Sequence, residues 1–333
     1  MSDGVTSTET VDLAAAAAAR ERIKDLCVVT PTRHSIVLSR QLGARVHLKI
    51  ESMQPTGAFK LRGAANAILS LPKEVRQRGI IAQSSGNHGR AVAYVASQLG
   101  IPAVICLSCR TPEAKIEAVR MLDVEVVVEG ADQMESIAVA ERIQADRGLR
   151  PIPPFDDPDV IAGQGTISLE LLEQCPDIDT IIVPVSGGGL AAGVAMVAKA
   201  LRPGIRVVGV SQDRGAAMYE SLMAGHLVEV EEEASWADAL VGGLPADNRW
   251  TIDMCGRWLD EIHLVSEDQI EAAMIHALRH EHLVLEGGGA VGPALLLSRP
   301  DDDWGKNVAV ICTGDNVAVE RLAALVTAEP AAS

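Results

Sequence analysis

Aromatic residues are scarce in this sequence of 333 residues: four Trp, two Tyr and two Phe, against a hydrophobic content of 48%. A core with so few rings must be built from Ala, Val, Ile and Leu, as in parallel sheets that are covered by helices. The length suits two domains or one large one. Charged residues make up 22%, which is typical of a folded chain rather than a disordered one. The composition therefore favours an α/β protein.

Positive charge is also in short supply, with 29 Lys and Arg against 45 Asp and Glu and a formal net charge of −16. This balance argues against electrostatic binding to nucleic acid or to an anionic membrane, so we expect neither as a partner. Residues 181–198 carry no charge, but Pro184 and the glycines at 187–189 would break a membrane-spanning helix. No basic region precedes the alanine run at 14–19, so no signal peptide is evident. The sequence predicts a cytoplasmic protein.

Cysteine is too sparse for a disulfide scaffold, because the six residues are scattered through apolar surroundings. Cys106 and Cys109 have the spacing of a redox or zinc pair, but no second pair accompanies them. His276 and His280 lie one helical turn apart without the adjacent glutamate of zinc proteases, which predicts a solvated helix face. We expect no metal site.

What the sequence does contain is a regular alternation of apolar strands and helices. Strands are expected at residues 46–50, 79–83, 101–107, 124–128, 180–185, 206–210 and 308–312. Helices are expected at residues 11–26, 63–71, 90–99, 111–121, 190–201 and 269–281. Thr111 is predicted to cap its helix, with Pro112 at the first helical position. Such alternation predicts two lobes, each with a mostly parallel sheet flanked by helices.

A glycine-rich turn joins one of these strands to its helix. Residues 181–185 form a buried-strand pattern, residues 186–189 read Ser-Gly-Gly-Gly, and Leu190 begins a helix. Successive backbone N–H groups at the positive end of a helix form an anion site. The turn is neither a Walker loop nor a dinucleotide fingerprint. It is interpreted either as a phosphate site or as a tight structural turn.

Lys60 lies in an apolar setting, between Phe59 and Leu61, and the nearby Gly57 and Gly63 let a bulky group approach the backbone. An amine in an apolar pocket has a lowered pKa and can form a Schiff base. The alternative is an ordinary solvated lysine.

A polar loop at residues 84–89, Ser-Ser-Gly-Asn-His-Gly, follows a strand and opens a helix. In open α/β sheets, ligands bind at the carboxyl ends of the strands. The hydroxyl and N–H groups of this loop suit a carboxylate, although a polar helix cap would look the same.

Taken in order, these elements resemble the pyridoxal-phosphate enzymes of fold type II, and within them the serine/threonine dehydratase and serine racemase group. The resemblance covers most of the chain and is carried by residues 30–31, 55–64, 85–89, 154–157, 163–166, 184–190 and 313–316. It implies the two-lobed α/β architecture of the tryptophan synthase β type. Residues 1–53 and 153–333 would form a large cofactor-binding domain, and residues 54–152 a small mobile domain.

The resemblance also implies roles for individual residues. Lys60 would hold pyridoxal 5'-phosphate as a Schiff base and act as base and acid, and Ser85 would be a second catalytic group on the opposite face. The implied cofactor contacts are Phe59, Lys60, Asn87, Ser186, Gly187, Gly188, Gly189, Leu190 and Thr313. The implied substrate contacts are Ser84, Ser85, Gly86, Asn87 and His88. The positions that hold a cation in serine racemases are occupied here by Ser211, Gly215 and Ala217, so no metal is expected there.

The implied function is a dehydratase that eliminates water from a small β-hydroxy-α-amino acid, giving a 2-oxo acid and ammonia. The chain ends soon after Thr313, which leaves no room for a regulatory domain and favours a catabolic role in a homodimer or homotetramer. Asp315 stands where the family commonly has glycine, and Ser186 also replaces a glycine.

Three alternatives stay open. A hydroxyectoine-utilisation dehydratase would use Asp315 to meet an extra ammonium on its substrate. A serine or hydroxyaspartate racemase would use Ser85 as the base on the second face. A non-catalytic ligand-binding module is the last, and the retention of Lys60 argues against it.

Overall fold

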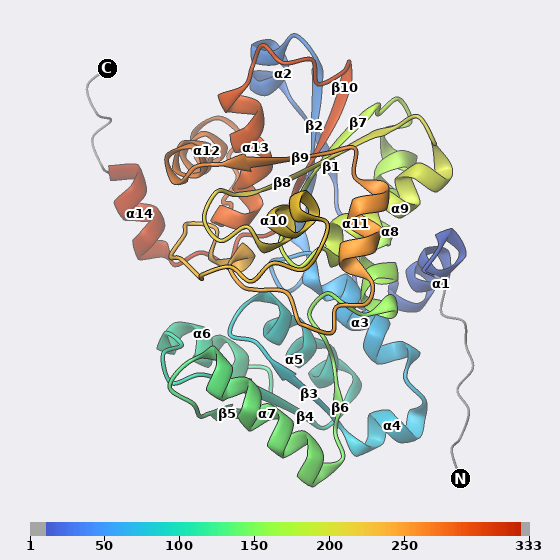
Figure 1. The fold of residues 1–333 in the computed structure, drawn as a ribbon, viewed down its shortest axis with the longest axis vertical. Helices are drawn as coiled ribbons and strands as arrows, with labels where there is room; N and C mark the ends of the chain where they lie inside the picture. Colours follow the sequence, from blue (N-terminus) through green and yellow to red (C-terminus); the bar gives the residue numbers. More distant parts are fainter. Residues whose placement is uncertain (1–10, 328–333) are drawn as a thin grey trace.

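The computed structural model describes residues 11–327. Two lobes are visible, each built on its own sheet (Figure 1). The larger sheet has the order β1-β2-β10-β7-β8-β9, and only β1 and β2 pair antiparallel. The smaller sheet has the order β5-β4-β3-β6 and is parallel throughout. The predicted two-lobed α/β fold with mostly parallel sheets is confirmed.

The strands of the larger sheet are β1 (Thr32–Ser35), β2 (Arg45–Ile50), β7 (Thr180–Pro184), β8 (Arg206–Gln212), β9 (Glu261–Val265) and β10 (Asn307–Cys312). Those of the smaller sheet are β3 (Ile80–Gln83), β4 (Ala103–Leu107), β5 (Glu125–Val128) and β6 (Arg150–Pro151).

Helices cover both faces of the larger sheet. On one face lie α8 (Pro158–Gln174) and α9 (Gly189–Leu201), and on the other α12 (Glu267–His280) and α13 (Gly287–Ser298). The sequence of β7 is uniformly apolar because both of its faces are buried. Ile181 and Val183 pack toward α8 and α9, whereas Ile182 packs toward α13. In the part of the chain that the structure describes, no helix combines the length and apolar character that a membrane span requires.

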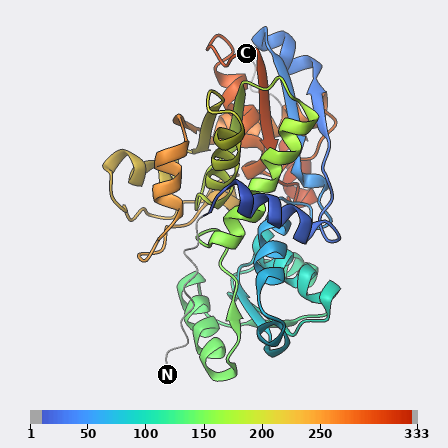
Figure 2. The same ribbon diagram turned by 90° about the vertical axis from the view of Figure 1, so that its right-hand side faces the viewer.

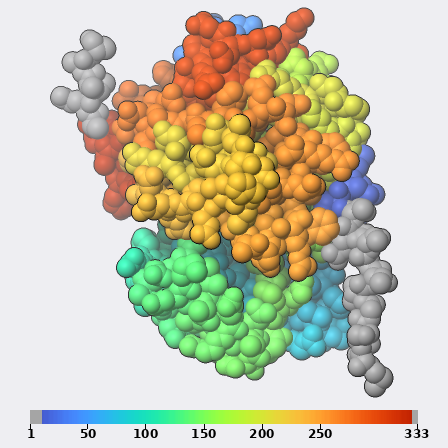
Figure 3. Space-filling view, viewed as in Figure 1, coloured from blue at the N-terminus to red at the C-terminus, as the bar shows by residue number. Residues whose placement is uncertain are grey.

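The other helices of this lobe are α1 (Leu13–Ile23), α2 (Ile36–Leu42), η1 (Glu51–Met53), α10 (Ala217–Ala224), η2 (Asp238–Leu240), α11 (Thr251–Trp258) and α14 (Val319–Thr327). Figure 3 shows the segment that follows β8, in gold and orange, covering one face of the larger lobe down to the smaller lobe. There Lys115 of α6 (Glu113–Arg120) pairs with Asp238 of η2 at 3.0 Å. This exposed ion pair bridges the two lobes.

The smaller sheet is covered in the same way. Helices α5 (Asn87–Leu99) and α6 pack on one face, α7 (Gln133–Arg147) packs on the other, and α4 (Lys73–Arg78) lies at the edge. The cap predicted for α6 was wrong, because Pro112 is the cap residue and no side chain bonds there. Thr111 instead belongs to a turn in which its N–H donates to the Ser108 carbonyl.

The solvated helix face predicted for His276 and His280 was also wrong in part. His276 is buried on α12, with its ring centroid 4.8 Å from that of His280. Helix α12 packs on α13, and its buried residues Ala273 and Ala277 lie on either side of position 276 in the sequence. The two histidines therefore do not form a free surface pair.

Helix α3 (Lys60–Ser70) lies between the lobes, packed against α8 and α1 on one side and against α5 on the other. Figure 2 shows α1, in dark blue, crossing this junction. A buried charge network fixes the start of α3 to the larger lobe. Arg62 bonds Glu51 at 2.7 Å and Glu170 at 2.6 Å, and Lys49 bonds Glu170 at 2.6 Å. Two cations facing two carboxylates leave no net charge buried, which is the condition under which such burial is tolerated.

Candidate active site

Lys60 is the first residue of α3 and lies at the junction of the lobes. Its Nζ donates to the Pro154 carbonyl at 2.8 Å and lies 5.5 Å from the centroid of the Phe59 ring. Burial disfavours the charged ammonium and lowers the pKa of Lys60 to about 8. The amine is therefore neutral far more often than a solvated lysine, and a neutral amine can attack a carbonyl carbon.

The glycine-rich turn between β7 and α9, called the glycine cradle below, is packed so closely that it has no room for side chains. A Cβ on Gly187 would lie 2.3 Å from the Phe155 ring, and Gly188 has a φ of +87°, which side chains rarely adopt. The first N–H groups of α9 have no intrahelical acceptor and point into this space. A glycine turn at a helix N-terminus is suited to holding an anion such as a phosphate.

The other two predicted members of the turn contribute differently. Ser186 donates its hydroxyl to the Leu240 carbonyl at 2.9 Å, so its side chain ties the turn to η2. Leu190 packs its side chain into the core beside α8, which leaves its N–H as the group that can face an anion.

One short segment connects Lys60 to this cradle. Pro154 accepts the hydrogen bond from Lys60, and the next residue, Phe155, packs over Gly187. The reactive amine and the anion cradle therefore lie on either side of two consecutive residues. An aldehyde bound to Lys60 and a phosphate on the same small molecule can be held together here.

Thr313 is brought to the same place by pairing of two segments distant in sequence. The Phe59 N–H donates to the Thr313 carbonyl at 3.0 Å, and the Asp315 N–H donates to the Gly57 carbonyl at 3.0 Å. Thr313 is buried and directly follows β10. Because β10 and β7 are parallel neighbours, Thr313 and the glycine cradle lie at the same edge of the sheet.

Asn87 opens α5 and joins the smaller lobe to the larger one. Its Nδ2 donates to Glu286 at 2.6 Å, and its Oδ1 accepts from Asn316 at 2.7 Å. Glu286 directly precedes α13 and is buried, and its burial together with the charge of Asp238 raises the pKa of Glu286 to about 7. Asn87 therefore has both ends of its amide engaged.

The polar loop ahead of α5 is partly open to solvent. Ser85 and Gly86 are exposed, and the Ser84 Oγ accepts from the Gly86 N–H at 3.2 Å. His88 is buried with its Nε2 2.8 Å from the Ile152 carbonyl, and burial, together with the charge of Lys60, lowers the pKa of His88 to about 3. Its neutral ring points away from the loop, so His88 could meet a substrate through its backbone N–H.

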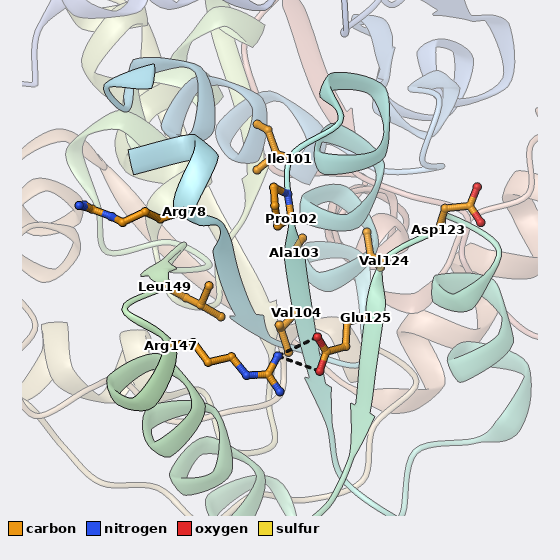
Figure 4. Close-up of a pocket in the computed structure, with 10 residues that line it drawn as sticks. All are labelled: Arg78, Ile101, Pro102, Ala103, Val104, Asp123, Val124, Glu125, Arg147 and Leu149. Atoms are coloured by element: carbon orange, nitrogen blue, oxygen red, sulfur yellow. Dashed lines mark hydrogen bonds and ion pairs between the residues drawn. The ribbon is translucent and has the colours of Figure 1, made fainter. Parts of the chain in front are cut away.

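A separate pocket of about 380 Å³ lies at the opposite edge of the smaller sheet, where β4 and β5 begin (Figure 4). Its lining includes Arg147 and Glu125, which neutralise each other in a two-bond ion pair at 2.7 and 2.9 Å. The pocket is therefore distinct from the place where Lys60, Asn87 and Thr313 meet. Within residues 11–327, no cluster of three His, Cys, Asp or Glu side chains could hold a metal ion.

Comparison with known proteins agrees with this geometry. The family model described as "Pyridoxal-phosphate dependent enzyme" matches residues 23–314. The chain belongs to this family of pyridoxal-phosphate dependent enzymes, so pyridoxal phosphate is its cofactor, as predicted.

Two curated relatives and two solved structures define the neighbourhood. A protein of Sinorhizobium fredii, provisionally named a threonine dehydratase, is 49% identical over 90% of each chain. L-threonine ammonia-lyase of Thermotoga maritima is 39% identical over 91% of this chain and 75% of that one. Maize serine racemase has a TM-score of 0.90 at 34% identity, covering 94% of this chain and 96% of that one. Threonine deaminase isoform 2 of Solanum lycopersicum has a TM-score of 0.89 at 33% identity, covering 97% and 89%.

The structure thus brings together Lys60, Phe59, Asn87, Thr313 and the turn at 186–190. Sequence reasoning missed what holds these residues in place. Phe155 was visible within the motif at 154–157, but its contact with Gly187 had no signal of its own. Arg90, which donates to Asn316 at 2.6 Å, carried no sequence signal either, because it reads as an ordinary helix-surface cation.

Proposed function

We propose that this chain is an ammonia-lyase that removes water from a small β-hydroxy-α-amino acid, such as L-serine or L-threonine, and releases a 2-oxo acid and ammonia. The observation that carries the proposal is the Lys60 amine, of lowered pKa, beside a glycine cradle. The support from relatives is that L-threonine ammonia-lyase of Thermotoga maritima matches 91% of this chain at 39% identity.

The residues present fit pyridoxal phosphate. The N–H groups of Gly187, Gly188, Gly189 and Leu190 would hold the phosphate, and Lys60 would bind the carbonyl carbon through Nζ. Asn87 would donate to the oxygen on the ring, Thr313 would face the ring nitrogen, and Phe59 would pack beside them. When bound, the cofactor supplies an electron sink conjugated with the substrate Cα.

The chain's own groups then have distinct tasks. Residues 84–88 would bind the substrate carboxylate, and the Lys60 Nζ, once released, would take the proton from Cα. The β-hydroxyl leaves with a second proton as water, and hydrolysis of the resulting enamine gives the 2-oxo acid and ammonia. Thr313 offers a neutral hydroxyl to the ring nitrogen, which stabilises a protonated ring poorly and favours elimination over transamination.

We further propose that the protein is cytoplasmic and works as a homodimer or homotetramer. Residues 54–152 would move as the small lobe and close over the substrate. The contacts of Asn87 with Glu286 and of Lys115 with Asp238 cross between the lobes and would change in that movement.

The test is a Lys60→Ala variant compared with Lys24→Ala, which removes a lysine whose side chain is 63% exposed. The wild type and Lys24→Ala proteins should be yellow, should be fixed to the cofactor by borohydride, and should release 2-oxo acid from L-serine or L-threonine. Lys60→Ala should do none of these. A Lys60→Ala protein with an unchanged visible spectrum would remove the basis of the assignment.

One observation favours a second candidate, a substrate with an additional ammonium group. Asp315 is half-buried beside Gly57, and burial raises its pKa while the charge of Arg90 opposes this. A carboxylate in such surroundings favours a cationic partner, and a charge-assisted hydrogen bond contributes roughly 1.5–3 kcal/mol. A hydroxylated diamino acid, as in hydroxyectoine use, would supply that partner.

This candidate is tested by the rate of 2-oxo acid release from 3-hydroxy-2,4-diaminobutyrate and from L-threonine at matched concentrations. The expected preference for the diamino acid is about 10- to 150-fold in wild type, and Asp315→Gly should narrow it. Asp268→Asn, an exposed carboxylate on α12, serves as the control. Equal or faster turnover of threonine by the wild type would sink the diamino-acid candidate and leave the general ammonia-lyase.

Racemisation through the exposed Ser85 is distinguished from elimination by measuring the products formed from L-serine in deuterated water. Incubation with L-serine should give pyruvate and little D-serine. Abundant D-serine, lost in Ser85→Ala, would make racemisation the main activity.

A further inference from the structure

A chain of four polar side chains runs from α5 to the larger lobe and back. Arg90 donates to Asn316 Oδ1 at 2.6 Å, and Asn316 Nδ2 donates to Asn87 Oδ1 at 2.7 Å. Asn87 Nδ2 donates in turn to Glu286 Oε1 at 2.6 Å. Asn316 Nδ2 also donates to the Thr56 carbonyl at 3.0 Å. Two of the four members, Asn316 and Asn87, are amides that could in principle be turned by 180°.

The chemistry of its neighbours fixes the direction of Asn316. A guanidinium can only donate, so Arg90 requires the Asn316 oxygen on its side. A backbone carbonyl can only accept, so Thr56 requires the Asn316 nitrogen on the other side. These two independent contacts give the same orientation. Asn316 therefore donates to Asn87, and Asn87 must accept through its oxygen.

The far end of the chain cannot set this direction. Burial and the charges of Asp238 and Asp315 raise the pKa of Glu286 to about 7. The hydrogen bond from Asn87 and the charge of Lys115 act in the opposite direction but are outweighed. Near neutral pH its carboxyl is thus protonated in part of the molecules, and a protonated carboxyl both donates and accepts. The orientation of Asn87 must come from the Arg90 end.

We infer that Arg90 and Asn316 are positioning residues that turn the Asn87 amide so that its nitrogen, not its oxygen, faces the cofactor. The inference rests on the proposed contact between Asn87 and the oxygen on the cofactor ring. The Asn87 nitrogen has two hydrogens: one goes to Glu286, and the second is free for that oxygen. If the amide were turned, two electron-rich oxygens would face each other and the contact would become repulsive.

The alternative is that these contacts simply hold the lobes together. Asn316→Asp separates the two explanations because it preserves the shape of the side chain. The new carboxylate still pairs with Arg90 but cannot donate, so Asn87 must turn its nitrogen toward position 316 and its oxygen toward the cofactor. Asn316→Ala removes the contact without imposing a direction.

The experiment measures the dissociation constant of pyridoxal phosphate by visible absorbance titration of apoprotein, together with the melting temperature of each apoprotein. Asn316→Asp should raise the dissociation constant about 10- to 150-fold, the range expected for one hydrogen bond to a charged group. Asn316→Ala should raise the dissociation constant less, and the melting temperatures show whether either variant disturbs the fold of the apoprotein. Arg90→Met should weaken binding, and Arg90→Lys, which also can only donate, should restore it.

Gln133→Glu is the control for the change from amide to carboxylate, since Gln133 is exposed at the start of α7. Its cofactor affinity should equal that of wild type. If Asn316→Asp binds the cofactor as tightly as Asn316→Ala, or if Arg90→Met has no effect, the inference is wrong. These titrations contain no substrate. A wild type that binds the cofactor but releases no 2-oxo acid would therefore count against the proposed function alone.

Discussion

Helix α3 carries two cations in its first turn whose surroundings differ sharply. Arg62 bonds both Glu51 and Glu170, and its side chain is 1% exposed. Lys60, two residues earlier, bonds the backbone carbonyl of Pro154. Burial alone would lower the pKa of either group.

Whether a carboxylate pairs with the cation decides whether its pKa rises or falls. For Arg62, the charge of Glu51 and the hydrogen bonds that Arg62 donates to both carboxylates outweigh burial and raise its pKa. For Lys60, burial is unopposed and lowers the pKa to about 8. The same helical turn therefore holds one cation that is locked in its charged form and one amine that can lose its proton. The first holds the fold together, and the second has the lowered pKa on which the proposed role of Lys60 depends.

The largest loss of activity is expected when Lys60 is replaced by arginine, the residue type at position 62. Lys60→Arg keeps a cation but introduces a group that cannot be deprotonated in a protein. Release of 2-oxo acid should fall by at least about 10²- to 10⁴-fold, the contribution of a positioned general base, and the visible band should disappear. Turnover within tenfold of wild type would show that a neutral amine at position 60 is not required.

The reciprocal change removes the paired cation. Arg62→Met leaves Glu51 and Glu170 with two buried negative charges and Lys49 as the remaining cation. Removing one member of a buried ion cluster costs about 3–5 kcal/mol of unfolding free energy. Urea denaturation of the apoprotein checks this value. A loss below about 1 kcal/mol would mean that the network contributes little to holding α3.

A smaller effect is expected in the pH dependence of apoprotein stability. Between pH 8 and 10.5, the unfolded chain keeps the Lys60 proton and the folded chain does not, since the folded pKa is about 8 and the ordinary value is 10.5. Stability therefore rises with pH in this window by at most about 3 kcal/mol. Lys60→Met should lack that rise, so the wild-type and variant curves should differ in slope above pH 8 and run parallel below it.

The smallest effect is expected for a balanced change in the network. Lys49→Met combined with Glu170→Gln removes one charge of each sign and leaves Arg62 paired with Glu51. The double variant should lose less than about 2 kcal/mol, whereas Lys49→Met alone should lose about 3–5 kcal/mol. A double-mutant cycle by urea denaturation measures the difference. Additive losses would contradict the view that charge balance, rather than each bond, is what matters.

The sequence predicted those parts of the molecule that depend on local pattern. Buried strands such as β7, and the turn at residues 186–189, follow from apolar runs, glycine and helix-start chemistry. Lys60 was predicted as a site residue from its apolar setting, and the role predicted for Thr313 came from the order of several motifs together. The charge network was not predicted, because Lys49, Glu51 and Glu170 become neighbours only through tertiary packing. Helices rich in polar residues, such as α7, were missed because their pattern is weakly amphipathic.

The contact between Phe155 and Gly187 has a consequence for how this protein can change over generations. A side chain at position 187 would collide with the Phe155 ring at 2.3 Å, whereas Gly188 is held by its backbone angle, which no neighbour can relieve. Substitutions at 187 are therefore epistatic: they become accessible only after position 155 has shrunk. With phenylalanine at position 155 a larger residue at 187 is excluded, so a smaller residue at 155 must come first.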